Sequence, residues 1–255
     1  MRYLLKKTII LLQKIDRKLF EQFFIKKIQE IPFFKRKKQF LHKEYLVRIK
    51  DLRQYKNLTY WNNLFNHLSI NKVQGDIVEC GVGNGESLSF ILFNLKYNQE
   101  FSDKSYIGFD SFEGFPEPSI YDKSPRNPAK GDWDHTNQNF VLSNLQKLGF
   151  LLNDFKKIKF FEGYFENTFN KEYENINKIS LLHLDCDLYS STKISLETWF
   201  NKVEKNGIIV FDEYKSEIDL NDFPGASKAI DNFLREDKKD IMICPITKKF
   251  YFIKK

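Results

Sequence analysis

One stretch of the chain, residues 76–89, constrains its fold more than any other. It reads Asp-Ile-Val-Glu-Cys-Gly-Val-Gly-Asn-Gly-Glu-Ser-Leu-Ser: an apolar, β-branched run, then glycines at alternate positions, then residues that favour a helix. Glycine lets a backbone turn tightly and approach a ligand closely, as it does in the strand-to-helix turns of nucleotide-binding sheets. The segment therefore predicts the first βα unit of a parallel sheet, with a ligand at the turn.

The rest of the chain after about residue 55 alternates short β-branched runs with amphipathic stretches, which is typical of βαβ units. We predict an α/β fold with a Rossmann-like sheet of about seven strands. The last two strands have no helix between them, which predicts a terminal hairpin and an antiparallel C-terminal edge strand in a mostly parallel sheet. The expected strands are 76–79, 105–109, 158–161, 180–184, 207–211, 241–244 and 249–253; the expected helices are 87–95, 138–148, 192–203 and 226–235, after a helical stretch through Trp61, Leu64 and Leu68.

Residues 1–54 differ from the rest in charge. The first 50 residues hold 15 Lys or Arg against 4 Asp or Glu, and apolar residues recur there at near-helical spacing. We predict a basic amphipathic helical extension at 1–54, followed by one domain at 55–255. The apolar stripe is expected to pack on the domain or on a second subunit, and peripheral contact with an anionic membrane through residues 1–50 is the sharper alternative.

Composition and sequence patterns argue against three classes of protein: membrane-spanning, zinc-binding and secreted. No run approaches the roughly 20 apolar residues of a membrane span, and the three cysteines form no CxxC or Cys/His pair that binds zinc. The N-terminal apolar run lacks a small-residue cleavage site, so a secretory signal is not expected. These features predict a cytoplasmic protein, peripheral at the inner membrane face if the arm binds lipid, and we expect a homo-oligomer.

The charges around the glycine turn indicate which cofactor it binds. Glu79 lies two residues before Gly81, and Glu86 opens the helix after Gly83 and Gly85. A pyrophosphate would be repelled by these acids, whereas a sulfonium cofactor with a free ammonium group prefers them. We therefore predict S-adenosylmethionine. Ser87, at the helix start, belongs to the same expected set.

The second expected strand ends in Asp110, about 30 residues after the first acid. An acid at this place can hold both ribose hydroxyls of an adenosine cofactor. Asp110 is the predicted ribose ligand, and Ser111 joins it in the cofactor set. NAD-binding sheets carry an acid at the same place, so Asp110 does not choose between the two cofactors.

Two pairs of acids follow neighbouring strands of the predicted sheet. Asp185 and Asp187 follow the fourth strand, and Asp212 and Glu213 follow the fifth. The carboxyl ends of parallel strands share one edge, so these acids should converge beside the methyl donor. Oxygen ligands without histidine or thiolate favour Mg²⁺ or Mn²⁺. We predict a metal at Asp185, Asp212 and Glu213, which lowers the pKa of an acceptor hydroxyl.

The general base has two candidates. Asp187 is either a further ligand or the base. His135 lies in a long loop between the second strand and the next helix, a place suited to a lid over the acceptor, and is a candidate acid or base. His42, His67 and His183 are expected to be surface or packing residues.

Six ordered motifs resemble the macrocin O-methyltransferase family, the TylF/MycF-like enzymes that methylate deoxysugar hydroxyls. They are Gly75-Asp-Ile-Val-Glu-Cys-Gly-Val-Gly-Asn-Gly, Gly108-Phe-Asp-Ser-Phe-Glu-Gly-Phe-Pro, Glu162-Gly-Tyr-Phe-Glu-Asn-Thr-Phe, Leu184-Asp-Cys-Asp-Leu-Tyr-Ser-Ser-Thr, Phe211-Asp-Glu-Tyr and Pro224-Gly-Ala-Ser-Lys-Ala-Ile-Asp. The resemblance implies a class I methyltransferase fold, Mg²⁺ dependence, a sugar hydroxyl as acceptor, and Gly163 near the cofactor. Glu213 departs from the family, which commonly has a second Asp there.

The leading hypothesis is methyl transfer to a hydroxyl of a sugar or glycoside, such as a surface glycan, a nucleotide sugar or a natural-product sugar. A catechol-like small molecule is the alternative acceptor. From another class, a non-catalytic membrane-surface or partner-binding module stays open. A dehydrogenase does not explain the paired acids, and no Asn/Asp-Pro-Pro-Tyr/Phe segment supports a nucleic-acid partner.

Overall fold

The computed structural model describes residues 52–255, so the predicted extension at 1–54 and its membrane contact lie almost wholly outside the described residues. The helices are α6 (Leu52–Ile70), α7 (Glu86–Tyr97), α8 (Gln138–Lys147), α9 (Phe165–Glu172), α10 (Tyr189–Trp199), α11 (Glu217–Asp222) and α12 (Pro224–Leu234). The strands are β1 (Asp76–Cys80), β2 (Tyr106–Asp110), β3 (Ile158–Glu162), β4 (Ile179–Leu184), β5 (Val203–Phe211), β6 (Met242–Ile243) and β7 (Phe250–Ile253).

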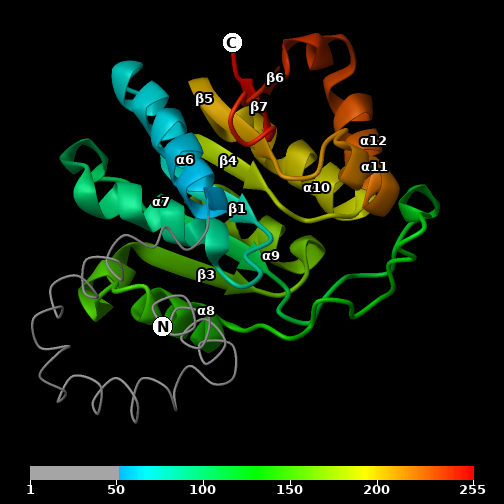
Figure 1. The fold of residues 1–255 in the computed structure, drawn as a ribbon, viewed down its shortest axis with the longest axis horizontal. Helices are drawn as coiled ribbons and strands as arrows, with labels where there is room; N and C mark the ends of the chain where they lie inside the picture. Colours follow the sequence, from blue (N-terminus) through cyan, green and yellow to red (C-terminus); the bar gives the residue numbers. More distant parts are fainter. Residues whose placement is uncertain (1–51) are drawn as a thin grey trace, which may run out of the picture. The chain divides into compact units, whose positions relative to one another are not determined.

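The strands form one seven-stranded sheet in the order β3-β2-β1-β4-β5-β7-β6 (Figure 1). Strands β1 to β5 pair in parallel, and β7 is antiparallel to both β5 and β6. The central strand β4 is buried along its whole length, as expected for a parallel strand covered on both faces, whereas the edge strand β3 is partly exposed. The mostly parallel sheet with an antiparallel C-terminal strand is therefore confirmed, with the two-residue β6 beyond it.

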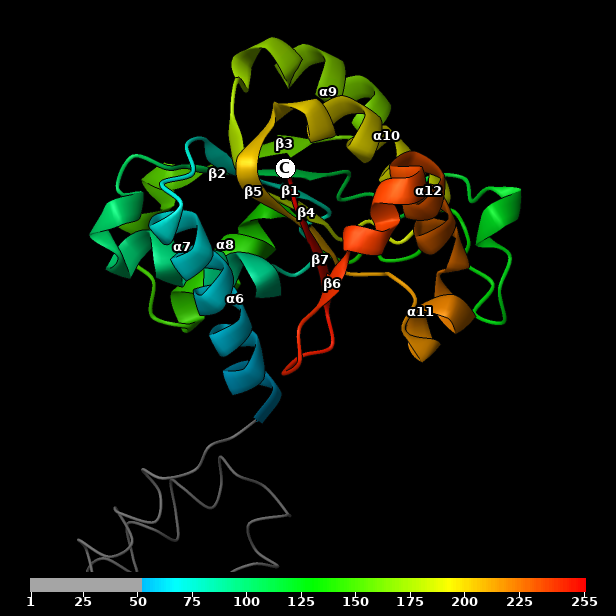
Figure 2. The same ribbon diagram turned by 90° about the horizontal axis from the view of Figure 1, so that it is seen from above.

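Helices cover both faces of the sheet, as the view from above shows (Figure 2). The first layer is α6, α7 and α8, whose apolar residues form one core with the sheet. The second layer is α9, α10 and α12, with Trp199 fully buried at its centre. In α6 the buried residues Tyr60, Trp61, Leu64, Phe65 and Leu68 recur at helical spacing and form one stripe. No helix in residues 52–255 combines the length and apolarity needed to cross a membrane.

Some expected elements and boundaries were wrong. Two short helices, α9 and α11, were not predicted, because each has few apolar residues and lies in a segment that reads as a strand-end loop. The helix expected at 192–203 ends at Trp199, and Val203 begins β5, four residues earlier than expected. Strand β6 is shorter than the predicted 241–244.

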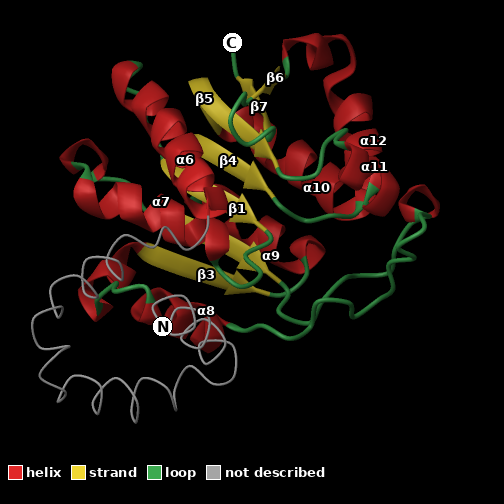
Figure 3. Cartoon of the chain, viewed as in Figure 1, coloured by secondary structure: helices red, strands yellow, loops and turns green. Residues whose placement is uncertain are grey.

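Because β1 to β5 are parallel, their carboxyl ends lie along one edge of the domain, where the long connections gather (Figure 3). The longest is the lid loop, residues 111–137, between β2 and α8. Two backbone hydrogen bonds close its base: the Phe115 amide donates to the Asp132 carbonyl at 2.9 Å, and the Gly131 amide donates to the Phe115 carbonyl at 3.0 Å. The lid loop thus has a fixed base above this edge.

Candidate functional site

The glycine turn after β1 touches the chain that leaves β4. Gly81 has a φ of +90°, and a Cβ there would lie 1.7 Å from the carbonyl oxygen of Asp185. The Asp185 amide also donates to the Cys80 carbonyl at 2.9 Å. Only glycine permits this approach, because a side chain would collide with backbone and favours negative φ. The turn and the first acid after β4 are therefore held in direct contact.

Asp110 supports the glycine turn from the end of β2. Its Oδ2 accepts hydrogen bonds from the amides of Val82 and Gly83 at 2.8 and 2.9 Å, and its Oδ1 accepts from the Phe112 amide at 2.8 Å. Bonds from backbone amides to an ionised carboxylate are among the stronger protein hydrogen bonds. The predicted ribose ligand is thus already fixed in place by three amides, and it lines the pocket described below.

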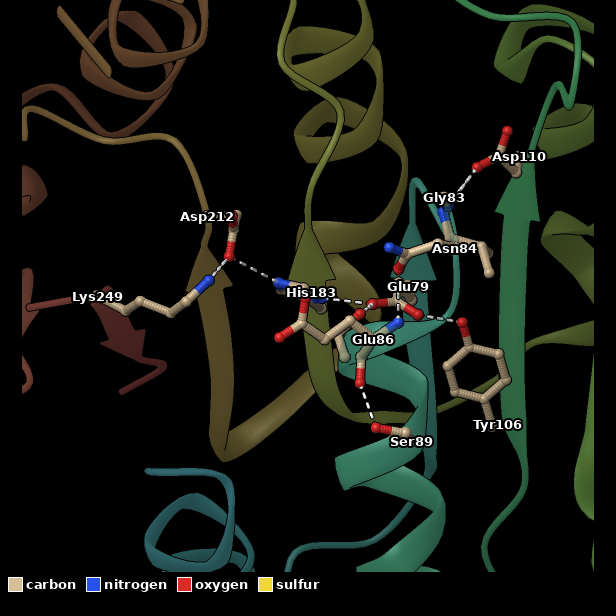
Figure 4. Close-up of polar contacts among 12 residues, drawn as sticks. Glu79, Gly83, Asn84, Glu86, Ser89, Tyr106, Asp110, His183, Asp212 and Lys249 are labelled. Carbon is tan, nitrogen blue, oxygen red and sulfur yellow. Dashed lines mark hydrogen bonds and ion pairs between the residues drawn. The ribbon is translucent and has the colours of Figure 1, made fainter. Parts of the chain in front are cut away.

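Glu79 lies beneath the turn and is absent from the lining of the pocket described below, and its expected contact with the cofactor stays a prediction. The residue is fully buried, and its carboxylate accepts a hydrogen bond from the hydroxyl of Ser87. It accepts another from the hydroxyl of Tyr106 (Figure 4). Gly108 lies opposite Glu79 in the β1–β2 ladder, and a Cβ there would crowd the Tyr106 hydroxyl. Of the two acids that flank the glycine turn, Glu79 and Glu86, it is Glu86 that lines the pocket described below.

His183 was expected to be a surface or packing residue. It is buried, and its imidazole lies between an acid of β1 and an acid that follows β5. It is fully buried on β4, and its Nδ1 lies 2.6 Å from Glu79 Oε1. Its Nε2 has no hydrogen-bond partner among residues 52–255 and lies 3.7 Å from Oδ1 of Asp212. One imidazole therefore separates the acid below the glycine turn from an acid at the end of β5.

The second acid cluster is the carboxylate trio Asp185, Asp212 and Glu213. One oxygen from each residue lies within 4.8 Å of the others. The trio consists of hard oxygen donors, which suits Mg²⁺ or Mn²⁺. Asp187 lies next to the trio. Its φ is +59°, and its amide donates a hydrogen bond to Glu213 Oε2 at 3.3 Å.

Three of these acids, Asp185, Asp187 and Glu213, have raised pKa values. Burial raises the pKa of Asp185 to about 6 and that of Asp187 to about 7. The pKa of Glu213 lies well above its usual range because the group is buried and because Asp187 and Asp185 repel its charge. Burial and like charges both disfavour ionisation, and a bound divalent cation would reverse this effect. The electrostatics of the trio therefore fit a cation.

The glycine turn and the carboxylate trio both face one pocket of about 390 Å³. Gly81, Gly83 and Asp110 line it on the side of β1 and β2, and Asp185, Asp212 and Glu213 line it on the side of β4 and β5. Trp133 and His135 of the lid loop line the same pocket. Trp133 is 54% exposed and has a φ of +70°, which is uncommon for a bulky residue and characteristic of functional segments.

Comparison with known proteins places this site in a family. Residues 52–249 match the family model of macrocin O-methyltransferase (TylF). The chain belongs to the macrocin O-methyltransferase family.

Two curated relatives match this family member over part of their length. It is 29% identical over 146 residues to 8-demethyl-8-(2,3-dimethoxy-alpha-L-rhamnosyl)-tetracenomycin-C 4'-O-methyltransferase of Streptomyces olivaceus, covering 56% of this chain and 54% of that protein. It is 26% identical over 148 residues to demethyldecarbamoylnovobiocin O-methyltransferase of Streptomyces niveus, again covering 56% and 54%. The match thus spans about half the length of each relative.

Solved structures show the same fold. The calicheamicin methyltransferase CalS11 superposes with a TM-score of 0.65 at 22% identity, covering 80% of each chain. The O-methyltransferase NovP superposes with a TM-score of 0.60 at 22% identity, covering 78% of this chain and 79% of that one. The Rossmann-like methyltransferase fold predicted from the six motifs is therefore confirmed.

The pocket of this macrocin O-methyltransferase family member gathers most of the expected site residues. Gly85 and Gly163 lie outside the lining: Gly85 packs near Val141 of α8, and the neighbour of Gly163, Tyr164, lines the pocket in its place. Phe115 and Trp133 are among the lining residues that sequence reasoning missed. The lid-loop segment around His135 carried the signal for Trp133, since an aromatic residue in a lid over a polar site is a common ligand contact.

Proposed function

We propose that the protein is an S-adenosylmethionine-dependent, divalent-metal-assisted O-methyltransferase that acts on a hydroxyl of a sugar or glycoside. The observation that carries this proposal is the contact between Gly81 and Asp185, which joins the glycine turn and the carboxylate trio in one pocket. A methyl donor above the turn and a hydroxyl beside the trio would then lie next to each other. Proximity of this kind supplies a large part of the rate enhancement in group transfer.

In this proposal the chain binds the cofactor through the β1 and β2 ends. Gly81 and Gly83 let the donor approach the backbone, and Asp110 and Ser111 face its ribose. Glu86 and Ser87, both of which line the pocket, provide the polar side chains of the first helical turn. A carboxylate near a sulfonium and an ammonium group is favourable, whereas it would repel a dinucleotide pyrophosphate.

The acceptor half would use Asp185, Asp212 and Glu213 to hold the metal. A bound divalent ion lowers the pKa of a coordinated hydroxyl and so makes the oxygen a better nucleophile. We assign the base role to Asp187, because it lines the pocket next to the trio and its amide contacts Glu213. When bound, S-adenosylmethionine would supply a methyl group on a sulfonium, which can leave with the carbon–sulfur electron pair. Asp187 would take the proton of the acceptor hydroxyl as its oxygen bonds to the methyl carbon.

The sugar acceptor is supported by the names of the relatives and by the lid loop. The tetracenomycin enzyme is named for a rhamnosyl substrate, and one CalS11 structure is described as a TDP-rhamnose 3'-O-methyltransferase. Trp133 presents an exposed aromatic ring at the pocket, and such rings offer apolar area with a fixed geometry to the carbon face of a ligand. Arg126 packs 5.5 Å from that ring and supports it.

The test is transfer of a labelled methyl group from S-adenosylmethionine to dTDP-rhamnose, to a rhamnoside and to catechol, each with Mg²⁺ and with a chelator. We expect label in a sugar acceptor, with Mg²⁺ only, and none with Asp185→Asn. Label in catechol alone would replace the sugar assignment, and label that persists with chelator would remove the metal from the mechanism.

A further inference from the structure

A lysine contacts the carboxylate trio from the side of the C-terminal hairpin. The Lys249 Nζ donates to Oδ1 of Asp212, and His183 Nε2 lies 3.7 Å from the same oxygen (Figure 4). The side chains of Lys249 and Asp212 are 27% and 25% exposed. This ion pair is therefore partly desolvated, where charge interactions are less screened than at an open surface.

Sheet pairing fixes this contact. Phe250 of β7 lies opposite Phe211 of β5 in an antiparallel ladder, so the residue before β7 falls next to the residue after β5. The turn before β7 is held as well, since the Cys244 amide donates to the Lys249 carbonyl at 2.8 Å. Lys249 is thus held beside Asp212 by backbone structure and not by a chance surface contact.

The charge around Lys249 explains why an ammonium group is tolerated there. Lys249 contacts Asp212, and the carboxylates of Asp185, Glu86 and Glu79 lie near enough to act on its charge. The ammonium group therefore offsets part of the carboxylate charge that would otherwise accumulate at this edge. A divalent cation bound by the trio would serve the same purpose and would be repelled by the lysine.

We propose that Lys249 is a resident counter-cation of the carboxylate trio, which holds Asp212 in the metal-free protein and weakens the binding of the divalent ion. The inference rests on the proposed function, because it takes the trio to be the metal site. It adds that the protein sets its own metal affinity through a residue that is not a ligand.

An alternative role for Lys249 predicts the opposite result. Hydrogen bonds from neighbouring residues often orient a ligating carboxylate, and their loss weakens metal binding by about 10–100-fold. If Lys249 only oriented Asp212, removing it would lower the metal affinity. If it competes through its charge, removing it will raise that affinity, roughly tenfold or more.

The experiment measures the dissociation constant of Mn²⁺ by the electron paramagnetic resonance signal of the free ion, in the full chain with S-adenosylhomocysteine present. The variants are Lys249→Met, Lys249→Gln and Lys249→Arg. Gln keeps a hydrogen-bond donor without the charge, and Arg keeps the charge. We expect Met and Gln to bind Mn²⁺ at least about tenfold more tightly than wild type, and Arg to stay within about threefold.

Lys215→Met is the matched control. It removes the same charge three residues after Asp212, but the Lys215 ammonium group pairs with Asp231 at 2.7 Å and lies outside the ion pairs of the trio in the described part of the chain. We expect less than about a twofold change in Mn²⁺ affinity. Thermal unfolding and titration with S-adenosylhomocysteine on the same samples establish that each variant is folded.

Unchanged or weaker Mn²⁺ binding by both Lys249→Met and Lys249→Gln overturns the counter-cation while leaving the proposed metal site intact. Binding by these two variants but not by wild type supports it in its strongest form. Absence of Mn²⁺ binding from every variant overturns both the inference and the metal part of the proposed function, whereas binding of S-adenosylhomocysteine still tests the methyltransferase assignment separately.

Discussion

The two halves of the pocket differ in how the chain satisfies its own charges. On the side of β1 and β2, the Asp110 carboxylate accepts hydrogen bonds from three backbone amides. The Glu79 carboxylate accepts hydrogen bonds from two hydroxyls and lies beside the His183 imidazole. On the side of β4 and β5, Asp185 and Glu213 have few such partners among residues 52–255 and raised pKa values. The charges of the proposed cofactor half, on the side of β1 and β2, are satisfied by the protein alone, whereas the proposed acceptor half, on the side of β4 and β5, has an excess of negative charge.

This difference shows which half depends on an added ion. A preorganised half needs no rearrangement to bind its ligand, which reduces the cost of binding. A half with clustered carboxylates is stabilised by any cation it receives, whether the Lys249 ammonium group or a metal. Changes in the cofactor half should therefore affect folding, and changes in the acceptor half should affect chemistry and metal binding.

The largest expected effect is on catalysis in the acceptor half. Asp187→Asn should lower kcat by about 10²–10⁴-fold, because the proposed base is lost while the side chain keeps its shape. The affinity for S-adenosylhomocysteine should change less than about twofold. Steady-state kinetics with His135→Gln in parallel separates the two candidate bases: a large loss in His135→Gln together with a small one in Asp187→Asn would move the role to the lid loop.

The next effect is on folding in the cofactor half. Gly81→Ala should destabilise the protein by about 3 kcal/mol or more, because the new Cβ meets the Asp185 carbonyl and the φ is unfavourable. Gly149→Ala is the control, since Gly149 also has a positive φ but none of the described residues places an atom within 4 Å of the added Cβ, and it should cost about 1 kcal/mol. Equal losses in urea unfolding would contradict the close contact.

A smaller effect is expected for the hydrogen bonds beneath the turn. Tyr106→Phe removes one donor from the buried Glu79 carboxylate and should cost about 2 kcal/mol in the free energy of unfolding. Tyr97→Phe, on the exposed end of α7, should change stability by less than about 0.5 kcal/mol. A neutral Tyr106→Phe would mean that Glu79 does not depend on this hydroxyl.

The smallest effect is the pH dependence of the metal-free protein. A carboxyl group with a raised pKa in the folded state favours folding at low pH, and this contribution is lost as the pH rises from the unfolded value of about 3.9 through the folded one. For Asp185 and Asp187 the loss extends through about pH 6 and pH 7. We expect the Tm with chelator to fall by about 2–4 °C between about pH 6.5 and 8.

Excess Mg²⁺ should reduce that fall, because a cation favours the ionised carboxylates. Differential scanning calorimetry across the pH series provides the comparison. A Tm that rises with pH in the chelated protein would contradict the charge excess of the acceptor half.

Much of the fold and of the site could be predicted from the sequence because it depends on strand order. Acids that follow parallel strands must meet at one edge, and Asp110, Asp185 and Asp212 do line the same pocket, as their positions after three expected strands predict. The six motifs predicted the family, and the match over residues 52–249 confirmed it.

What could not be predicted depends on side-chain direction and on distant pairing. Strand β1 continues to Cys80, one residue beyond the expected end, so Glu79 lies within the ladder opposite His183 and not at the strand's exit. Lys249 was expected as the first residue of the last strand, 249–253, with no role at the site, and only the antiparallel pairing of β7 with β5 places it at Asp212. The predicted division at residues 54 and 55 stays a prediction.

The most direct test of the central claim is calorimetric titration of the full chain with S-adenosylhomocysteine and with NADH, each with and without Mg²⁺, in wild type and in an Asp185→Asn/Asp212→Asn double variant. We predict binding of S-adenosylhomocysteine but not NADH, and Mg²⁺ uptake that the double variant loses while it still binds the cofactor product. Binding of NADH, or no binding of S-adenosylhomocysteine, would contradict the account.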